Sequence, residues 1–369
     1  MRSSAISRLG LSLLMFLIVR EVSAHPDEVI GDYQECKLCL AVPIAPDNSI
    51  GRPQWELNAG VPFVGSPVHE NMTKATVTLS NVHGRKFQDS IDEAYIHGVF
   101  WNDDPEDLLC PECSFFNLKK FDRRWGIAFA GRFLDAKARA RDAATNGKQP
   151  AFGIGDALLE RSHFGDLQFL HGMASSDGEP AAETQAKILA WAEFAYKTAT
   201  GKISQTSKLK DIPIKGVRDL FVGDARLESM TIEQLFGGKK FARRAAMGSL
   251  LHMIQDSYAP GHAERQIADW PHPDGKVFAR GSVTEFHCYL NQDSDLHAAD
   301  DKWPSGLRTD RIQDDRNPIS TGAQILRFMY ANGGTGAPWP EVEAYLQASV
   351  FAIVAGNAPA GPGQKYKRK

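Results

Sequence analysis

Residues 239–258 carry the clearest structural signal in this 369-residue chain. Large apolar side chains recur there at steps of three and four residues, which places them on one face of an α-helix. They are Met247, Leu250, Leu251, Ile254 and Tyr258. Pro260 and Gly261 follow and predict the end of the helix. Because other elements must cover such a face, we expect this helix to lie in the core.

Further helices are predicted by the same periodicity, whereas alternating strand patterns are scarce. We expect these helices over 68–82, 121–143, 181–199, 283–291, 319–331 and 340–355. Residues 98–118 resemble a loop, and 201–215 resemble a polar surface connection. The predicted fold class is all-α, a single-domain helical bundle.

The first 24 residues have the features of a secretory signal peptide. Arg2 and Arg8 give a positive start, Leu9–Val19 form an apolar run of 11 residues, and Ala24 ends a small-residue cleavage site. The run is shorter than the roughly 20 residues that cross a bilayer. We therefore expect a secreted protein, extracellular or periplasmic, cleaved near Ala24.

The rest of the chain divides by composition. Residues 25–64 are rich in Pro, Asn and Gly and predict an irregular amino-terminal arm. Residues 65–358 form the predicted helical domain. Residues 359–369, rich in Gly, Pro and Lys, predict a flexible basic tail.

Four of the five cysteines form two C-x-x-C pairs. One motif contains Cys36 and Cys39, and the other contains Cys110 and Cys113. Two such pairs have the layout of a four-cysteine zinc site, but secretion favours disulfide bonds. Both interpretations stay open, and either one would attach the arm to the helical domain. We expect Cys288 to be a buried free thiol.

The helix over 239–258 also carries His252 and Asp256. Residues four apart lie on one face of a helix, so both side chains can reach the same cation. His262 follows the helix break, where a loop can bring it back to that place. A single His–Asp pair is more often structural, but three such groups at short range favour a zinc site.

A second pair with the same spacing is His297 and Asp301. His287 and Asn291 compete with it, although asparagine is a poorer zinc ligand than aspartate. Upstream, Asp103 and His163 are polar groups among large apolar neighbours, and His69 opens a predicted helix that His69-Glu70 could simply cap. Taken singly, such residues are more often structural than functional. His171 is expected to be a buried structural histidine.

In their order along the chain, these residues resemble the zinc-dependent phospholipase C family and the related single-strand-specific nucleases. The most specific family element is His-x-x-x-Asp-x-x-x-Pro-x-His, matched by His252, Asp256, Pro260 and His262. Shorter elements are matched by His69-Glu70, Trp101-Asn102-Asp103, His163-Phe164 and the pair His297 and Asp301.

The resemblance implies an all-α fold with about three zinc ions at the bottom of a cleft. One zinc would be held by Asp103, His163, His252 and Asp256. A second would share Asp256 as a bridge and also bind His69. The third would be held by His262, His297 and Asp301. In many relatives the mature amino terminus completes a zinc site, whereas here the predicted start, His25, lies 44 residues before His69.

The activity that the resemblance implies is hydrolysis of a phosphodiester by a metal-bound hydroxide, with Asp103 as the catalytic residue that orients the water or accepts its proton. We favour a phospholipase C that cleaves phosphatidylcholine-type lipids during transient contact with a membrane surface. A net charge of −3, from 42 basic and 45 acidic residues, predicts no stable nucleic-acid partner. The alternatives are a single-strand-specific zinc nuclease and a non-enzymatic secreted zinc-binding protein.

Overall fold

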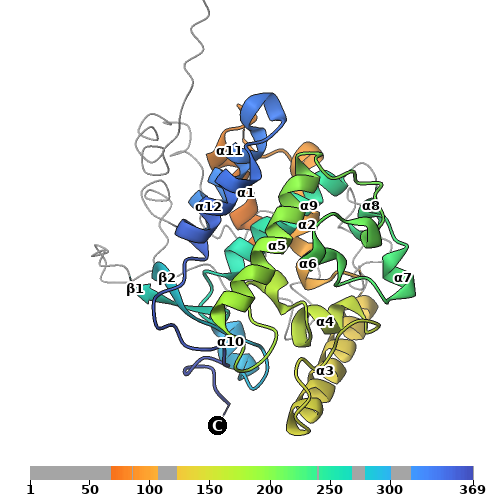
Figure 1. The fold of residues 1–369 in the computed structure, drawn as a ribbon, viewed down its shortest axis with the longest axis vertical. Coiled ribbons are helices and arrows are strands. Elements are labelled where there is room, and N and C mark those ends of the chain that lie inside the picture. Colours follow the sequence, from red (N-terminus) through yellow and green to blue (C-terminus); the bar gives the residue numbers. More distant parts are fainter. Residues whose placement is uncertain are drawn as a thin grey trace, which may run out of the picture. The chain divides into compact units, whose positions relative to one another are not determined.

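Helix α9, Ala242–Asp256, is buried along nearly its whole length, as its apolar face predicts. It packs most extensively against α2, Asp89–Asp103, and α5, Ala181–Ala199. It also contacts α1, Val68–Ser80, and α11, Pro318–Gly334 (Figure 1). The helix that the sequence predicts in the core is therefore the one on which α1, α2, α5 and α11 pack.

A computed structural model of the protein describes residues 68–84, 86–106, 123–238, 241–267, 279–300 and 317–368. The remaining longer helices are α3, Arg123–Thr145, α4, Leu158–Phe164, α10, Ser294–Asp300, and α12, Trp339–Tyr345. Short helices are η4, Gln168–His171, η5, Leu209–Asp211, α6, Lys215–Arg218, α7, Ala225–Glu228, α8, Ile232–Leu235, and the π-helical turn η7, Leu346–Val350.

Several sequence-based expectations fall outside the described residues. They concern the signal peptide, the amino-terminal arm, Asp301, and the four paired cysteines Cys36, Cys39, Cys110 and Cys113. A zinc site and two disulfide bonds therefore both remain predictions for these cysteines. The fifth, Cys288, is a buried free thiol, as expected.

The described residues are mostly helical, which confirms the coarse fold class, but they include one antiparallel pair of strands. Strand β1, Ala263–Ile267, pairs with β2, Ala279–Phe286. The helix expected over 283–291 is therefore wrong. Val283 and Phe286 are both buried, although they are three residues apart, a spacing typical of a helix. The register of the two strands shifts between Val283 and Phe286, and this irregularity interrupts the in-and-out alternation of a regular strand.

Two predicted loops are also structured. Residues 98–103 are the last part of α2, where the buried Trp101 stacks on Trp191 of α5 with ring centroids 5.8 Å apart. The segment 201–215, expected at the surface, buries Ile203, Leu209 and Ile212 in the core. The many polar residues of this segment led to the prediction of a surface connection, because its few apolar residues follow no regular spacing.

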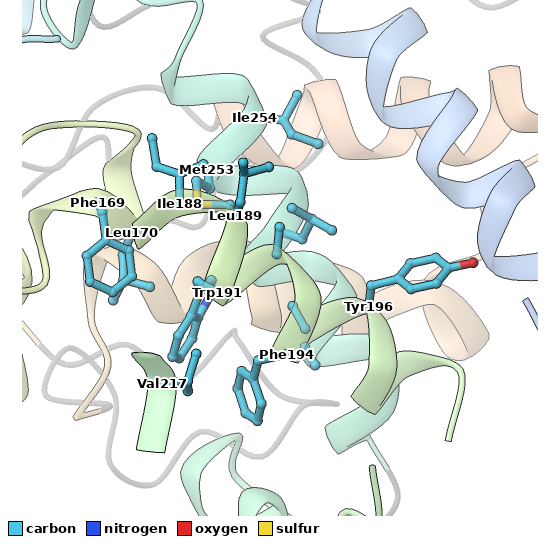
Figure 2. Close-up of a cluster of buried hydrophobic side chains, with 14 of the residues drawn as sticks. Phe169, Leu170, Ile188, Leu189, Trp191, Phe194, Tyr196, Val217, Met253 and Ile254 are labelled. Atoms are coloured by element: carbon cyan, nitrogen blue, oxygen red, sulfur yellow. The ribbon is translucent and has the colours of Figure 1, made fainter. Parts of the chain in front are cut away.

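The main core lies between α5, α9 and η4. Figure 2 shows Met253 of α9 beside Ile188 and Leu189 of α5, and Trp191 and Phe194 of α5 belong to the same cluster. Phe169 and Leu170 of η4 belong to the same cluster. Packing of η4 against α9 fixes the position of the next residue of η4, His171.

The carboxyl-terminal residues 360–368 are held against the helical domain, in contrast to the flexible tail that their composition predicted. Their backbone forms hydrogen bonds with residues 178–179, 288, 291 and 293. In the part of the chain that the structure describes, no helix has both the length and the apolar character needed to cross a membrane.

Candidate metal centre

The buried carboxylate of Asp256, at the end of α9, faces histidines from three other parts of the chain as well as from its own helix. Its Oδ2 lies 2.8 Å from Nε2 of His252 and 2.9 Å from Nδ1 of His171. Its Oδ1 lies 3.2 Å from Nε2 of His69 on α1. His252 and Asp256 share one helical face, as their spacing predicts.

One group of possible ligands consists of Asp103, His171 and His252. Oδ1 of Asp103 lies 3.7 Å from Nε2 of His252 and 3.9 Å from Nδ1 of His171, and the two ring nitrogens are 3.1 Å apart. Two ligands of a tetrahedral zinc ion are about 3.4 Å apart when each bond is about 2.1 Å. The three side chains, with Asp256 beside them, are therefore close enough to hold one metal ion.

The second group consists of His69, His252 and Asp256. Nδ1 of His69 lies 3.0 Å from Oε1 of Gln255, and the amide of Gln255 donates to Thr73 Oγ1 at 2.9 Å. The amide oxygen can only accept, so Nδ1 of His69 carries the proton and Nε2 presents its lone pair toward Asp256. His69 is thus oriented as a ligand would be.

His262, just before β1, and His297, in α10, approach each other with ring centroids 4.8 Å apart. Nδ1 of His262 donates to the carbonyl of His171 at 2.8 Å, which leaves the lone pair on Nε2. That Nε2 is buried and has no hydrogen-bond partner. Asp301, the third ligand expected here, lies outside the described residues.

His163 does not join either group, in contrast to the sequence-based expectation. Its Nδ1 donates to the carbonyl of Leu159 at 3.1 Å, one turn earlier in α4. His171, which was expected to be structural, takes the place beside Asp256, and its ring lies 4.9 Å from that of His163. The structure thus brings His171, and not His163, to within 2.9 Å of Asp256, and the sequence around His171 carries no comparable signal.

The alternative pair His287 and Asn291 does not form a site either. Nδ1 of His287 donates to the carbonyl of Gly261 at 3.1 Å. Asn291 is exposed in a turn with φ of 64°, so the i, i+4 geometry of a helix is absent. Tyr289 lies between these two residues in the sequence and was not among the predicted site residues. Its ring centroid lies 4.9 Å from that of His297.

The contact between α2 and α9 brings Asp103 next to His252. The two backbones meet at Gly98 and Gly248, where a Cβ atom would lie 1.9 Å from the carbonyl oxygen of Ala245 and 2.2 Å from that of Tyr95. Only glycine permits this approach. The crossing sets the distance between the helices, and with it the separation of their ligands.

Buried hydrogen bonds then fix the end of α2. Asn102 donates to the carbonyl of Leu170 at 2.6 Å and to that of Ser249 at 3.2 Å. Ser249 Oγ donates to Asn102 Oδ1, and the indole of Trp191 donates to Ser249 Oγ. This network joins the three elements that carry Asp103, His171 and His252.

Electrostatics favour a cation at this place. Burial lowers the pKa values of His171 and His252, which keeps their rings neutral and able to bind a metal. Burial raises the pKa of Asp256, but in acid, where the histidines are protonated, the charges of His252, His262 and His69 outweigh burial and lower that pKa well below 3.8. A buried ionised carboxylate is costly without a cation, so a bound metal ion would stabilise this arrangement.

The donor set fits zinc. Neutral imidazoles and carboxylates are typical zinc ligands, and the lone pairs of His69 and His262 are set by hydrogen bonds at the opposite ring nitrogen. Half-exposed Asp103 leaves one side of the group accessible to solvent. Such an opening is typical of a catalytic metal site.

Comparison of the chain with protein-family models, curated proteins and solved structures found no match.

Proposed function

We propose that the protein is a secreted zinc-dependent phosphodiesterase, a phospholipase C that cleaves phosphatidylcholine-type lipids to diacylglycerol and a phosphorylated headgroup. The observation that carries the proposal is the position of Asp256, whose two oxygens face different histidines. A carboxylate placed in this way suits a bridge between two cations, the arrangement used to cleave phosphodiesters.

Zinc ions bound here would lower the pKa of a shared water molecule to about 7 and neutralise charge on the phosphate. His171 and His252 would bind the first ion with Asp103 and Asp256. His69 and Asp256 would bind the second. His262 and His297 would bind the third, with Asp301 as expected from the sequence.

Asp103 is the residue best placed to handle the water. Its carboxylate is half-exposed, whereas His171, His252 and Asp256 are buried. Oδ1 of Asp103 is also farther from the histidine nitrogens than the oxygen of Asp256 is. We propose that Asp103 orients the attacking water and accepts its proton.

The choice of lipid as substrate depends on the sequence resemblance and on the slightly acidic composition, which suits a polyanionic nucleic acid less well. A phospholipase C of this kind would contact a membrane surface only during turnover. Release of the headgroup needs no organic cofactor, so zinc is the only cofactor proposed.

The test combines metal analysis with turnover assays. Protein purified without chelator should contain about three zinc ions, hydrolyse phosphatidylcholine vesicles, and lose activity when zinc is removed. Asp256→Asn serves as the inactive control. Efficient cleavage of single-stranded DNA with intact lipid would replace the proposal with a zinc nuclease. Absence of any tightly bound transition metal would end it.

A further inference from the structure

We infer that the carboxyl-terminal segment 360–368, here called the C-terminal strap, positions His262 and His297 as metal ligands. The inference depends on the proposed function, because it assigns these two histidines to a metal. The strap crosses residues 287–293, the stretch that lies between β2 and α10.

The strap holds both ends of α10. The backbone amide of Asp293 donates to the carbonyl of Tyr366 at 2.7 Å. Asp293 in turn caps the helix, because its Oδ1 accepts from the amides of Asp295 and Leu296. At the other end, Asp300 accepts hydrogen bonds from the hydroxyl of Tyr366 and the ammonium of Lys365.

His297 lies on α10 between these two attachments. A helix of seven residues has little stability of its own, so contacts from outside must keep it folded. The side chain of Tyr366 is almost fully buried, and its ring lies 6.4 Å from that of His297. Loss of the strap would therefore release the helix that carries this ligand.

The strap also reaches His262. Gln292 donates through Nε2 to the carbonyl of Pro362 at 2.9 Å and to that of Gly261 at 2.8 Å. The carbonyl of Gly261 also accepts from Nδ1 of His287. Gly261 directly precedes His262, so the strap fixes the main chain at the second ligand through Gln292.

Gly363 allows the strap to lie this close. It has φ of 75°, and a Cβ atom there would lie 2.4 Å from Cε1 of His287. An alanine would therefore clash with the ring in addition to carrying backbone strain. Gly356 has φ of 73° but nothing within 4 Å of its Cβ position.

These two glycines make a matched pair for the test. Gly363→Ala and Gly356→Ala carry similar backbone strain, but only Gly363→Ala would push the strap away from the ring of His287. We measure hydrogen exchange of residues 294–300 and bound zinc per chain. Gly363→Ala should speed exchange in α10 by about tenfold or more and lose about one zinc ion. Gly356→Ala should leave both values unchanged.

Tyr366→Phe provides a second variant that keeps the buried ring and removes only the hydroxyl bound to Asp300. It should also speed exchange in α10 and weaken binding of the last zinc ion, while the thermal stability of the whole protein changes little. Unchanged exchange in α10 in both Gly363→Ala and Tyr366→Phe would overturn the inference. If the wild-type protein binds no metal, the proposed function fails, and the exchange of α10 in these variants still shows whether the strap holds the helix.

Discussion

Asn102 and Ser249 form a reciprocal pair of hydrogen bonds across the contact of α2 and α9. Ser249 Oγ donates to Asn102 Oδ1 at 2.6 Å, and Asn102 Nδ2 donates to the carbonyl of Ser249 at 3.2 Å. The pair lies one residue from Asp103 and three residues from His252. It links the packing of the two helices to the geometry of the proposed ligands.

Asn102→Ala should therefore lower the free energy of unfolding by about 3 kcal/mol, because it leaves several buried groups without partners. Urea unfolding measures this value. Asn357→Ala is the control, since the side chain of Asn357 donates only to the neighbouring carbonyl of Ala358 near the surface, and its backbone bond to Val354 is unaffected. Its effect should stay within about 0.5 kcal/mol. Equal effects of the two variants would show that the pair does not stabilise the contact.

His171→Gln and His163→Gln test which histidine binds the first metal. His171→Gln should reduce zinc content and activity, because Nδ1 of His171 lies 2.9 Å from Asp256. His163→Gln should retain zinc, since His163 bonds Leu159 within its own helix. Metal analysis after gel filtration distinguishes them. The opposite result would restore the sequence-based assignment of His163.

Asp256→Asn and Asp103→Asn should separate metal binding from catalysis. Asp256→Asn removes the charge that two cations would share, so it should lose zinc, activity and stability together. Asp103→Asn should keep more of the zinc but lose activity by about 10²–10⁴-fold, as expected for a missing general base. Zinc titration and turnover assays give both values. Equal zinc loss in the two variants would make Asp103 chiefly a ligand.

Gly98→Ala should prevent the close contact of α2 and α9, because the new Cβ would lie 1.9 Å from a backbone oxygen. The variant should be destabilised by several kcal/mol or fail to fold. Gly131→Ala is the control on α3, where nothing lies within 4 Å of the Cβ position. It should stabilise the protein by about 0.5–1 kcal/mol, since alanine favours a helix. Thermal unfolding of both variants checks the contrast.

The protein should lose stability in acid because His97, a residue outside the proposed site, must then be protonated. Burial lowers the pKa of His97 to about 4, against an ordinary value of 6.5. The unfolded chain binds a proton at higher pH than the folded protein does, so this contribution is complete above pH 6.5 and is lost as pH falls toward 4. The whole loss is about 3 kcal/mol.

His97→Gln should reduce this pH dependence, because glutamine does not titrate and retains a hydrogen-bond donor. Urea unfolding of wild-type protein and variant at about pH 7 and about pH 4.5 measures the difference. The same loss of stability in both proteins would show that other groups cause it.

The sequence predicted the elements whose pattern is local. The apolar stripe located α9, and the four-residue spacing placed His252 beside Asp256. The periodicity also predicted α1, α5 and α11 to within a few residues. These predictions succeed because a helical face depends on neighbours along the chain.

The features that the sequence did not predict depend on distant residues. His171 reaches Asp256 because η4 packs on α9, which no pattern near His171 indicates. The sequence predicts no helix over α2 and predicts a loop from residue 98 that holds Trp101-Asn102-Asp103-Asp104-Pro105, whereas the structure continues the helix to Asp103. The composition of the tail predicts flexibility, but its backbone is held by residues 178–179 and by residues 288, 291 and 293, which lie far away in the sequence.

The uneven exposure of the proposed ligands has a kinetic consequence. The side chain of Asp103 is 42% exposed and that of His69 is 16% exposed, whereas those of His171, His252 and Asp256 are at most 1% exposed. Among the described residues, solvent therefore reaches this group through Asp103 and His69. With a metal ion bound as proposed, a chelator and a substrate would approach from this same side, so we expect a bound substrate analogue to slow the loss of the metal ion.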